Sequence, residues 1–163
     1  MHPKGKILFK ETQRFTQWWI WLFLLLMAAL PVYGCIQQLM LGTAWGNNPM
    51  SNTGLVLFTI GMFAFVYFFS WMQLDTVITK KGIFMKYRPF LKKFFSWEQI
   101  KSATCVTYSF VGYGIRYSSN GMVYNTAGNK GLELTLTNGK KYIIGTQKEE
   151  ELKQMLTKIQ LNN

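Results

Sequence analysis

The chain has 163 residues, enough for one ordinary domain or for a membrane anchor with one small domain. Its net charge of +11 predicts an anionic partner, such as lipid head groups, nucleic acid or an acidic protein surface. The single histidine excludes most histidine-based metal sites and catalytic triads. Two cysteines cannot form a disulfide framework. Because Cys35 lies inside an apolar run, we expect no bond to Cys105 and a reducing compartment.

Charged residues are absent from one long stretch of the chain. Residues 15–74 contain no Asp, Glu, Lys or Arg, although the mean hydropathy of the whole chain is only +0.07. The helices and strands of a soluble protein need a polar face, so a charge-free stretch of this length predicts membrane-spanning segments. In this interpretation, residues 1–14 form a basic cytoplasmic tail and residues 15–74 form a transmembrane hairpin.

The predicted hairpin consists of two spans, at about residues 18–41 and 54–74, on either side of a segment rich in Gly, Asn and Pro. About 20 apolar residues cross the hydrocarbon core of a bilayer, so both spans are long enough. Each span holds eleven Leu, Ile, Phe or Val residues, which favour insertion by roughly 3–7 kcal/mol in total. The alternative is a pair of helices buried in a soluble core.

Basic residues flank the two spans on one side only. Lys4, Lys6, Lys10 and Arg14 precede the first span, six more Lys or Arg residues lie within residues 80–93, and the connecting loop has none. The positive-inside rule therefore predicts a multi-pass protein of the bacterial inner (cytoplasmic) membrane, with both termini in the cytoplasm.

A cleaved lipoprotein signal is a competing interpretation of the first span. The segment Val32-Tyr33-Gly34-Cys35 is loosely similar to a lipobox, in which Cys35 would carry the lipid. Tyr33 stands where such a box usually has a small residue, and the apolar run continues beyond the cysteine. We therefore favour the transmembrane hairpin.

Residues 75–163 have a different pattern, with seven short β-rich runs separated by turn residues. Asn138-Gly139 predicts a tight hairpin between the last two runs. Thr146 and Glu149 have the spacing of a capping box, which predicts the start of a helix. The apolar stripe of this C-terminal helix would consist of Leu152, Met155, Leu156 and Ile159.

Several short motifs in the last third of the chain are characteristic of one family. They are Gly112-Tyr113-Gly114-Ile115-Arg116, Tyr124-Asn125, Gly128-Asn129-Lys130-Gly131, Ile143-Ile144-Gly145-Thr146-Gln147 and Glu150-Glu151-Leu152. With these motifs, residues 75–163 resemble the bacterial pleckstrin-homology-like (PH-like) domains of small membrane proteins with two N-terminal transmembrane helices. The resemblance covers about half the chain.

The resemblance implies a fold and no established activity. The expected fold is that of an α+β membrane protein. A two-helix transmembrane hairpin would precede a seven-stranded antiparallel PH-like β-barrel or sandwich with a C-terminal helix.

The basic residues that follow the second span are the first candidate binding site. Lys86 and Arg88 would share one face of a strand and point at one anionic head group together. Each basic residue near a membrane surface contributes about 1 kcal/mol of attraction to anionic lipid. The alternative is a topology signal on a solvated face. The candidate residues are Lys80, Lys81, Lys86, Arg88, Lys92 and Lys93.

Arg116 is the second candidate, because it lies in a stretch rich in aromatic residues and glycine. Its guanidinium group is suited to binding a carboxylate or phosphate while stacking on an aromatic ring. The alternative is a structural arginine that binds loop carbonyls. The nearby aromatic residues are Tyr108, Phe110, Tyr113 and Tyr117.

The sequence contains no pattern that predicts catalysis. A phosphate-binding loop, a dinucleotide fingerprint and a Cys/His metal spacing are all absent, and none of the seven acids forms an obvious catalytic pair. We therefore expect no catalytic residue, metal or cofactor. A nucleic-acid partner is not expected either, because the predicted hairpin would hold the basic residues beside a membrane.

These observations predict a non-enzymatic module that presents a binding surface at the inner leaflet. It would act as a scaffold or assembly subunit, for a protein partner or for self-association. A sensor of anionic phospholipid is the alternative. A membrane-bound enzyme would require Arg116, Glu133 and the tyrosines to converge in one cavity.

Overall fold

The computed structural model describes residues 6–109, 112–118 and 121–160. The chain divides into two compact units. The helical unit is Thr16–Trp71, and the β unit combines the residues before it with those from Met72 onward. Lys4 of the predicted tail and Phe110 of the aromatic stretch lie outside the described residues. Cys35 belongs to the helical unit, Cys105 belongs to the β unit, and both thiols are free.

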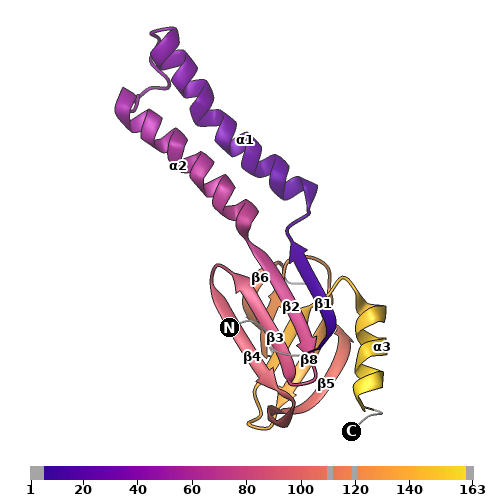
Figure 1. Cartoon of the computed structure of the whole chain (residues 1–163). Helices are drawn as coiled ribbons and strands as arrows, with labels where there is room; N and C mark the ends of the chain where they lie inside the picture. Colours follow the sequence, from indigo (N-terminus) through magenta and orange to yellow (C-terminus); the bar gives the residue numbers. More distant parts are fainter. Residues whose placement is uncertain (1–5, 110–111, 119–120, 161–163) are drawn as a thin grey trace. The chain divides into compact units, whose positions relative to one another are not determined.

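The helical unit is a hairpin of two helices that lie side by side (Figure 1). Helix α1 (Trp18–Cys35) is extended by the π-helix η1 (Ile36–Met40), and helix α2 (Asn52–Trp71) follows the loop. The buried residues of α1 recur every three or four positions and form one stripe along the helix. Several of them are small or compact, which allows the helices to approach closely. They are Leu24, Ala28, Pro31 and Gly34.

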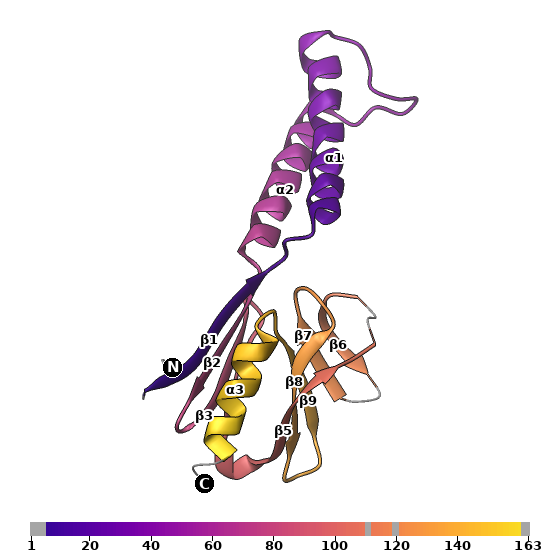
Figure 2. The same cartoon turned by 90° about the vertical axis from the view of Figure 1, so that its right-hand side faces the viewer.

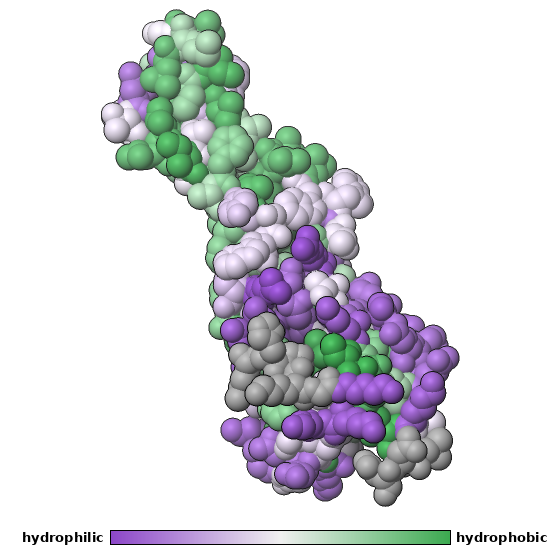
Figure 3. All heavy atoms as spheres, viewed as in Figure 1, coloured by the Kyte–Doolittle hydropathy of each residue, from purple (hydrophilic) through white to green (hydrophobic). Residues whose placement is uncertain are grey.

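Both segments of the hairpin, Trp18–Met40 and Asn52–Trp71, are long and apolar enough to cross a membrane. Only 22% and 6% of their apolar windows are buried, so most of their large hydrophobic side chains point outward (Figure 3). The predicted end of the second span is wrong. The helix stops at Trp71, and Leu74 is fully buried in the core of the β unit.

The β unit contains two sheets. Sheet A consists of β1 (Ile7–Arg14), β2 (Gln73–Thr79), β3 (Gly82–Arg88) and β4 (Leu91–Ser96), in that order and all antiparallel. Sheet B has the order β5-β8-β9-β7-β6. Its strands are β5 (Ile100–Thr107), β6 (Gly114–Ser118), β7 (Gly121–Asn125), β8 (Lys130–Leu136) and β9 (Lys141–Gly145). A 3-10 turn, η2 (Trp97–Gln99), joins the sheets, and helix α3 (Glu149–Gln160) ends the described chain.

The prediction of an α+β chain with a C-terminal helix is confirmed, but the seven-stranded antiparallel barrel is wrong. The described parts of the chain contain nine strands in two separate sheets, which do not close into a barrel. The pair β7–β9 is parallel. Strands β1 and β6 were not predicted from the sequence. Strand β6 is short and lies at the edge of sheet B. Its apolar residues Ile115 and Tyr117 are exposed while Arg116 is half-buried, so its sequence lacks the usual pattern of apolar residues facing inward.

The facing sides of the two sheets enclose one hydrophobic core. Ile83, Met85 and Tyr87 point into it from β3, and the leucines of β8 point into it from sheet B. Helix α3 covers the side of the core between β1 and β5 (Figure 2). The predicted apolar stripe of this helix is confirmed, because Leu152, Met155 and Leu156 are buried and Ile159 packs against the same core.

Two local sequence motifs precede α3, and the structure confirms one of the two predictions made from them. The Asn138-Gly139 hairpin between β8 and β9 is confirmed, and Gly139 has the positive φ of +80° that such a turn requires. The capping box is wrong. The Thr146 hydroxyl accepts a hydrogen bond from the Lys148 N–H at 3.0 Å, and the Glu149 carboxylate binds lysine side chains.

Residues 7–14, which were assigned to a tail, form the edge strand β1 of sheet A. The sequence of this strand does not alternate between apolar and polar residues, because two of its three buried residues are polar. Phe9, Glu11 and Gln13 are buried, at 2–4% exposure. The Glu11 carboxylate accepts hydrogen bonds from the Thr146 hydroxyl and the Gln147 N–H, both at 2.7 Å. The Gln13 amide donates to the Gly145 carbonyl at 2.5 Å. Strand β1 is therefore bound to the segment between β9 and α3.

Burial raises the pKa of Glu11, and the hydrogen bonds from Thr146 and Gln147 oppose that rise. A raised pKa in the folded state means that the folded protein holds this proton more tightly than the unfolded chain does. The stabilisation from protonated Glu11 is therefore fully present below the ordinary pKa of 4.5 and is lost as the pH rises through the raised value.

We expect the thermal unfolding midpoint of the detergent-solubilised chain to fall between pH 4.5 and pH 7 more steeply in the wild type than in Glu11→Gln. The amide keeps one acceptor for the Gln147 N–H but does not titrate. Glu11→Ala leaves that N–H unsatisfied, so it should cost about 1–3 kcal/mol at either pH. Equal pH slopes for the wild type and Glu11→Gln would contradict this account.

Candidate functional site

The predicted basic cluster is distributed over three different surfaces of the β unit. Lys80 and Lys81 are exposed in the turn between β2 and β3. Lys86, Arg88 and Lys92 lie on the outer face of sheet A, which is the face directed away from sheet B. Lys93 points to the opposite side of β4, toward sheet B. The separation follows from strand geometry, because successive side chains point to opposite faces.

On the outer face of sheet A, two lysines of the cluster are direct cross-strand neighbours. Lys86 lies directly opposite Lys92 in the β3–β4 pairing. Like charges placed opposite each other destabilise a sheet unless an anion lies between them. Neither lysine forms an ion pair with a described residue. The neighbouring row contains Val77, Phe84 and Phe94, of which Phe94 is 49% exposed. The outer face thus combines unbalanced positive charge with apolar surface.

Arg88 lies on the same face, but its charge is balanced within the sheet. Its Nε is 3.0 Å from the Asp75 carboxylate. The same carboxylate accepts hydrogen bonds from the Thr12 hydroxyl at 2.8 Å and from the Gln73 amide at 2.9 Å. Asp75 thus binds one side chain from each of the strands β1, β2 and β3, and this arrangement stabilises their pairing. It leaves Arg88 less available to an external anion than Lys86.

Lys93 connects the two sheets. Its Nζ lies 4.3 Å from the centroid of the Tyr142 ring and 5.4 Å from that of the Tyr124 ring. These rings belong to β9 and β7 of sheet B. Contacts of a cation with aromatic faces contribute roughly 0.5–2 kcal/mol, depending on how far the cation is desolvated. We therefore assign Lys93 to a structural role.

Arg116 lies on β6, over a small second cluster of buried residues on sheet B. Its guanidinium carbon is 5.8 Å from the centroid of the Tyr108 ring, and its Nη1 donates to the Gly112 carbonyl. The Asn125 amide donates to the Tyr108 hydroxyl at 3.1 Å, and burial raises the pKa of Tyr108. Nε and Nη2 of Arg116 are buried and have no acceptor among the described residues. The contacts with Gly112 and Tyr108 match the structural interpretation.

An enzyme would require Arg116 and Glu133 to converge in one cavity, but these residues lie far apart. They lie in one cross-strand row on the same face of sheet B, in which Glu133 pairs with Ile143, Ile143 with Val123, and Val123 with Arg116. Three strand spacings of about 4.8 Å place them roughly 14 Å apart. The apolar side chains of β9 and β7 occupy the positions between them.

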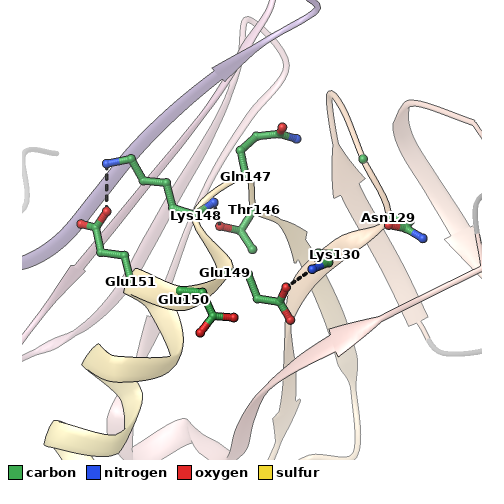
Figure 4. Close-up of a pocket in the computed structure, with 9 residues that line it drawn as sticks. Asn129, Lys130, Thr146, Gln147, Lys148, Glu149, Glu150 and Glu151 are labelled. Atoms are coloured by element: carbon green, nitrogen blue, oxygen red, sulfur yellow. Dashed lines mark hydrogen bonds and ion pairs between the residues drawn. The ribbon is translucent and has the colours of Figure 1, made fainter.

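A shallow hollow of about 530 Å³ lies beside the start of α3 (Figure 4). The glutamates that line this hollow form ion pairs with lysines. Glu149 binds Lys130 and also Lys153, at 2.9 Å, while Glu151 lies 3.0 Å from Lys148. The ion pairs, first that with Lys130, lower the pKa of Glu149. A carboxylate held ionised by two lysines is a poor general acid, so this hollow is a junction between α3 and β8.

A larger groove, of about 940 Å³, lies where the start of β1, the β2–β3 turn, η2 and α3 meet. Lys80 lines this groove together with Lys6, near the N-terminus, and Lys158, near the C-terminus. Trp97 and Met155 supply apolar surface. Sequence reasoning missed this grouping because its members lie more than 70 residues apart. The one available signal was Lys158, the second lysine of the C-terminal helix.

The described residues contain no group of three His, Cys, Asp or Glu side chains placed to hold a metal ion. Comparison of the chain with protein-family models, with curated proteins and with solved structures found no match. The resemblance to PH-like domains therefore stays a prediction that depends on the sequence motifs alone.

Proposed function

We propose that this chain is a membrane-anchored, non-enzymatic module of the PH-like type. Its β unit binds a protein partner, or a second copy of the chain, at the inner face of the bacterial cytoplasmic membrane. The observation that carries the proposal is the insertion of the helical hairpin between two paired strands. Arg14, at the end of β1, lies opposite Gln73, at the start of β2. Anchor and β unit are thus joined at two adjacent points.

Exposed apolar surface supports the membrane anchor. Helix α2 contains ten Leu, Ile, Phe or Val residues and no charge, which favours insertion by roughly 3–6 kcal/mol. Monomeric soluble proteins rarely expose contiguous apolar patches of more than a few hundred Å². Side chains such as Leu57, Ile60 and Phe63, each more than half exposed, would have to be covered in water. Lipid covers them without a further partner.

Charge next to the helices supports the sidedness. Lys10 and Arg14 precede α1, and Lys80 and Lys81 follow α2 in the turn between β2 and β3. The loop of residues 41–51 carries no charge. The positive-inside rule places such a loop outside and both termini in the cytoplasm.

In a Cys35→Ser, Cys105→Ser background, we expect Asn48→Cys to react with a membrane-impermeant maleimide in intact spheroplasts. Lys140→Cys, in the β8–β9 turn, should react only after the membrane is disrupted. Both positions are exposed, so the comparison reports sidedness rather than burial. The reverse labelling pattern, or labelling of both positions in intact spheroplasts, would overturn the proposed topology.

The acids support a binding role rather than catalysis. Of the seven acids, five make internal contacts: Glu11 binds the β9–α3 connection, Asp75 binds Arg88, and Glu149, Glu150 and Glu151 bind lysines. Carboxylates held in this way are not available for general acid–base chemistry. The apolar row beside Lys86 and Lys92 supplies a surface that suits a protein contact, since aromatic side chains are enriched in interfaces.

A photo-reactive phenylalanine analogue in place of Phe94 should crosslink, in intact membranes, to a discrete product of fixed mass. The product is either a dimer of the chain or a complex with one other protein, which mass spectrometry distinguishes. The matched control places the analogue at Tyr117, which is 80% exposed on sheet B. Absence of a product at position 94, or an identical pattern at both positions, would count against this surface.

Binding of anionic phospholipid is a second candidate function, favoured by the unbalanced Lys86–Lys92 pair. At about 1 kcal/mol each, two lysines account for a roughly 30-fold preference for anionic lipid. The full hairpin already anchors the chain. Such a preference would therefore orient the β unit rather than recruit it.

Lys86→Gln together with Lys92→Gln should reduce the retention of phosphatidylglycerol by the detergent-purified full-length chain, measured by native mass spectrometry against phosphatidylcholine. Lys80→Gln together with Lys81→Gln removes the same charge from the exposed turn and should change retention little. Equal losses in the two double variants would show that total charge, not this site, determines lipid retention.

A further inference from the structure

We propose that the groove between α3 and the start of β1 binds an acidic peptide segment that carries a large apolar side chain. This inference deepens the proposed role as a protein-binding module by assigning the partner chemistry to a defined surface. The groove is separate from the outer face of sheet A, because its walls are α3, η2, the β2–β3 turn and the first residues of β1.

Three lysines form the positive rim of the groove, and each comes from a different element. Lys6 precedes β1, Lys80 lies in the β2–β3 turn and Lys158 lies on α3. Neither Lys6 nor Lys80 forms an ion pair with a described residue. The acid at the rim, Glu151, has its carboxylate 3.0 Å from Lys148, whose side chain is not part of the lining. The groove is therefore complementary to negative charge.

Apolar side chains line the groove beneath this rim. The Trp97 indole N–H donates to the Thr79 carbonyl at 3.0 Å, which fixes the orientation of the ring. Met155, Leu8 and Ile7 extend the apolar surface, and Ile7 is 49% exposed. A purely phosphate-bearing ligand would leave this surface unused. An acidic segment that carries large apolar side chains matches both the lysines and the apolar lining of the groove.

The size and position of the groove suit an extended peptide. Its volume of about 940 Å³ is at the upper end of the range of ligand-binding pockets. Strand β1 is an edge strand, and among the described residues the backbone of residues 6–8 makes no hydrogen bond outside its pairing with β2. Extended peptides commonly bind to such free edges through main-chain hydrogen bonds.

The test uses the detergent-purified full-length chain and a fluorescent hexapeptide with four glutamates and two leucines, followed by fluorescence anisotropy. We expect saturable binding that weakens at least tenfold in Lys6→Gln with Lys80→Gln. The matched control, Lys140→Gln with Lys141→Gln, removes two exposed lysines at the β8–β9 turn, which do not line the groove, and should weaken binding less than twofold. Ile7→Ser should weaken binding without removing charge.

Three results would overturn the inference. The first is equal affinity for the same peptide with glutamine in place of glutamate. The second is equal weakening by the two double-lysine variants. The third is displacement of the peptide by phosphatidylglycerol micelles in a manner that depends on Lys6 and Lys80, which would assign the groove to lipid. None of these results affects the crosslink from position 94 or the labelling of the loop, so failure here is distinguishable from failure of the proposed function.

Discussion

The pairing of β1 with β2 is the constraint on which the rest of the structure depends. The two strands are separated in sequence by the whole helical hairpin, yet they pair from Ile7 with Thr79 to Arg14 with Gln73, with one irregularity between Ile7 and Phe9. Closing a long flexible loop costs entropy, and a loop that folds locally into two helices avoids much of that cost. The hairpin returns the chain to the position from which it left, because its helices are of similar length.

Buried polar contacts then determine the register of β1. Glu11 and Gln13 point inward at positions where an ordinary strand would carry apolar residues, and both bind the segment between β9 and α3. A slip of one residue would turn both side chains to the other face and expose Phe9. Buried polar groups need partners of defined geometry, so these contacts connect sheet A to sheet B more specifically than apolar packing does.

Strand alternation explains why a run of basic residues does not form one site. Lys92 and Lys93 are adjacent in sequence, yet one lies on the outer face of sheet A and the other contacts two tyrosine rings of sheet B. Most acids are paired internally, and part of the positive charge that remains lies on the outer face of sheet A and in the groove between α3 and the start of β1. Both surfaces combine lysines with aromatic or aliphatic side chains, as expected of a module that binds anionic, partly apolar partners.

The sequence by itself determined the features that depend on neighbouring residues. These are the two apolar helices, the Asn138-Gly139 turn and the apolar stripe of α3, since helical spacing and turn chemistry are local properties. Only the tertiary structure decided that residues 7–14 form a strand and that Lys80 joins Lys6 and Lys158 in one groove. Both outcomes depend on partners more than 60 residues away, and the polar inward face of β1 is stable only because those partners satisfy it.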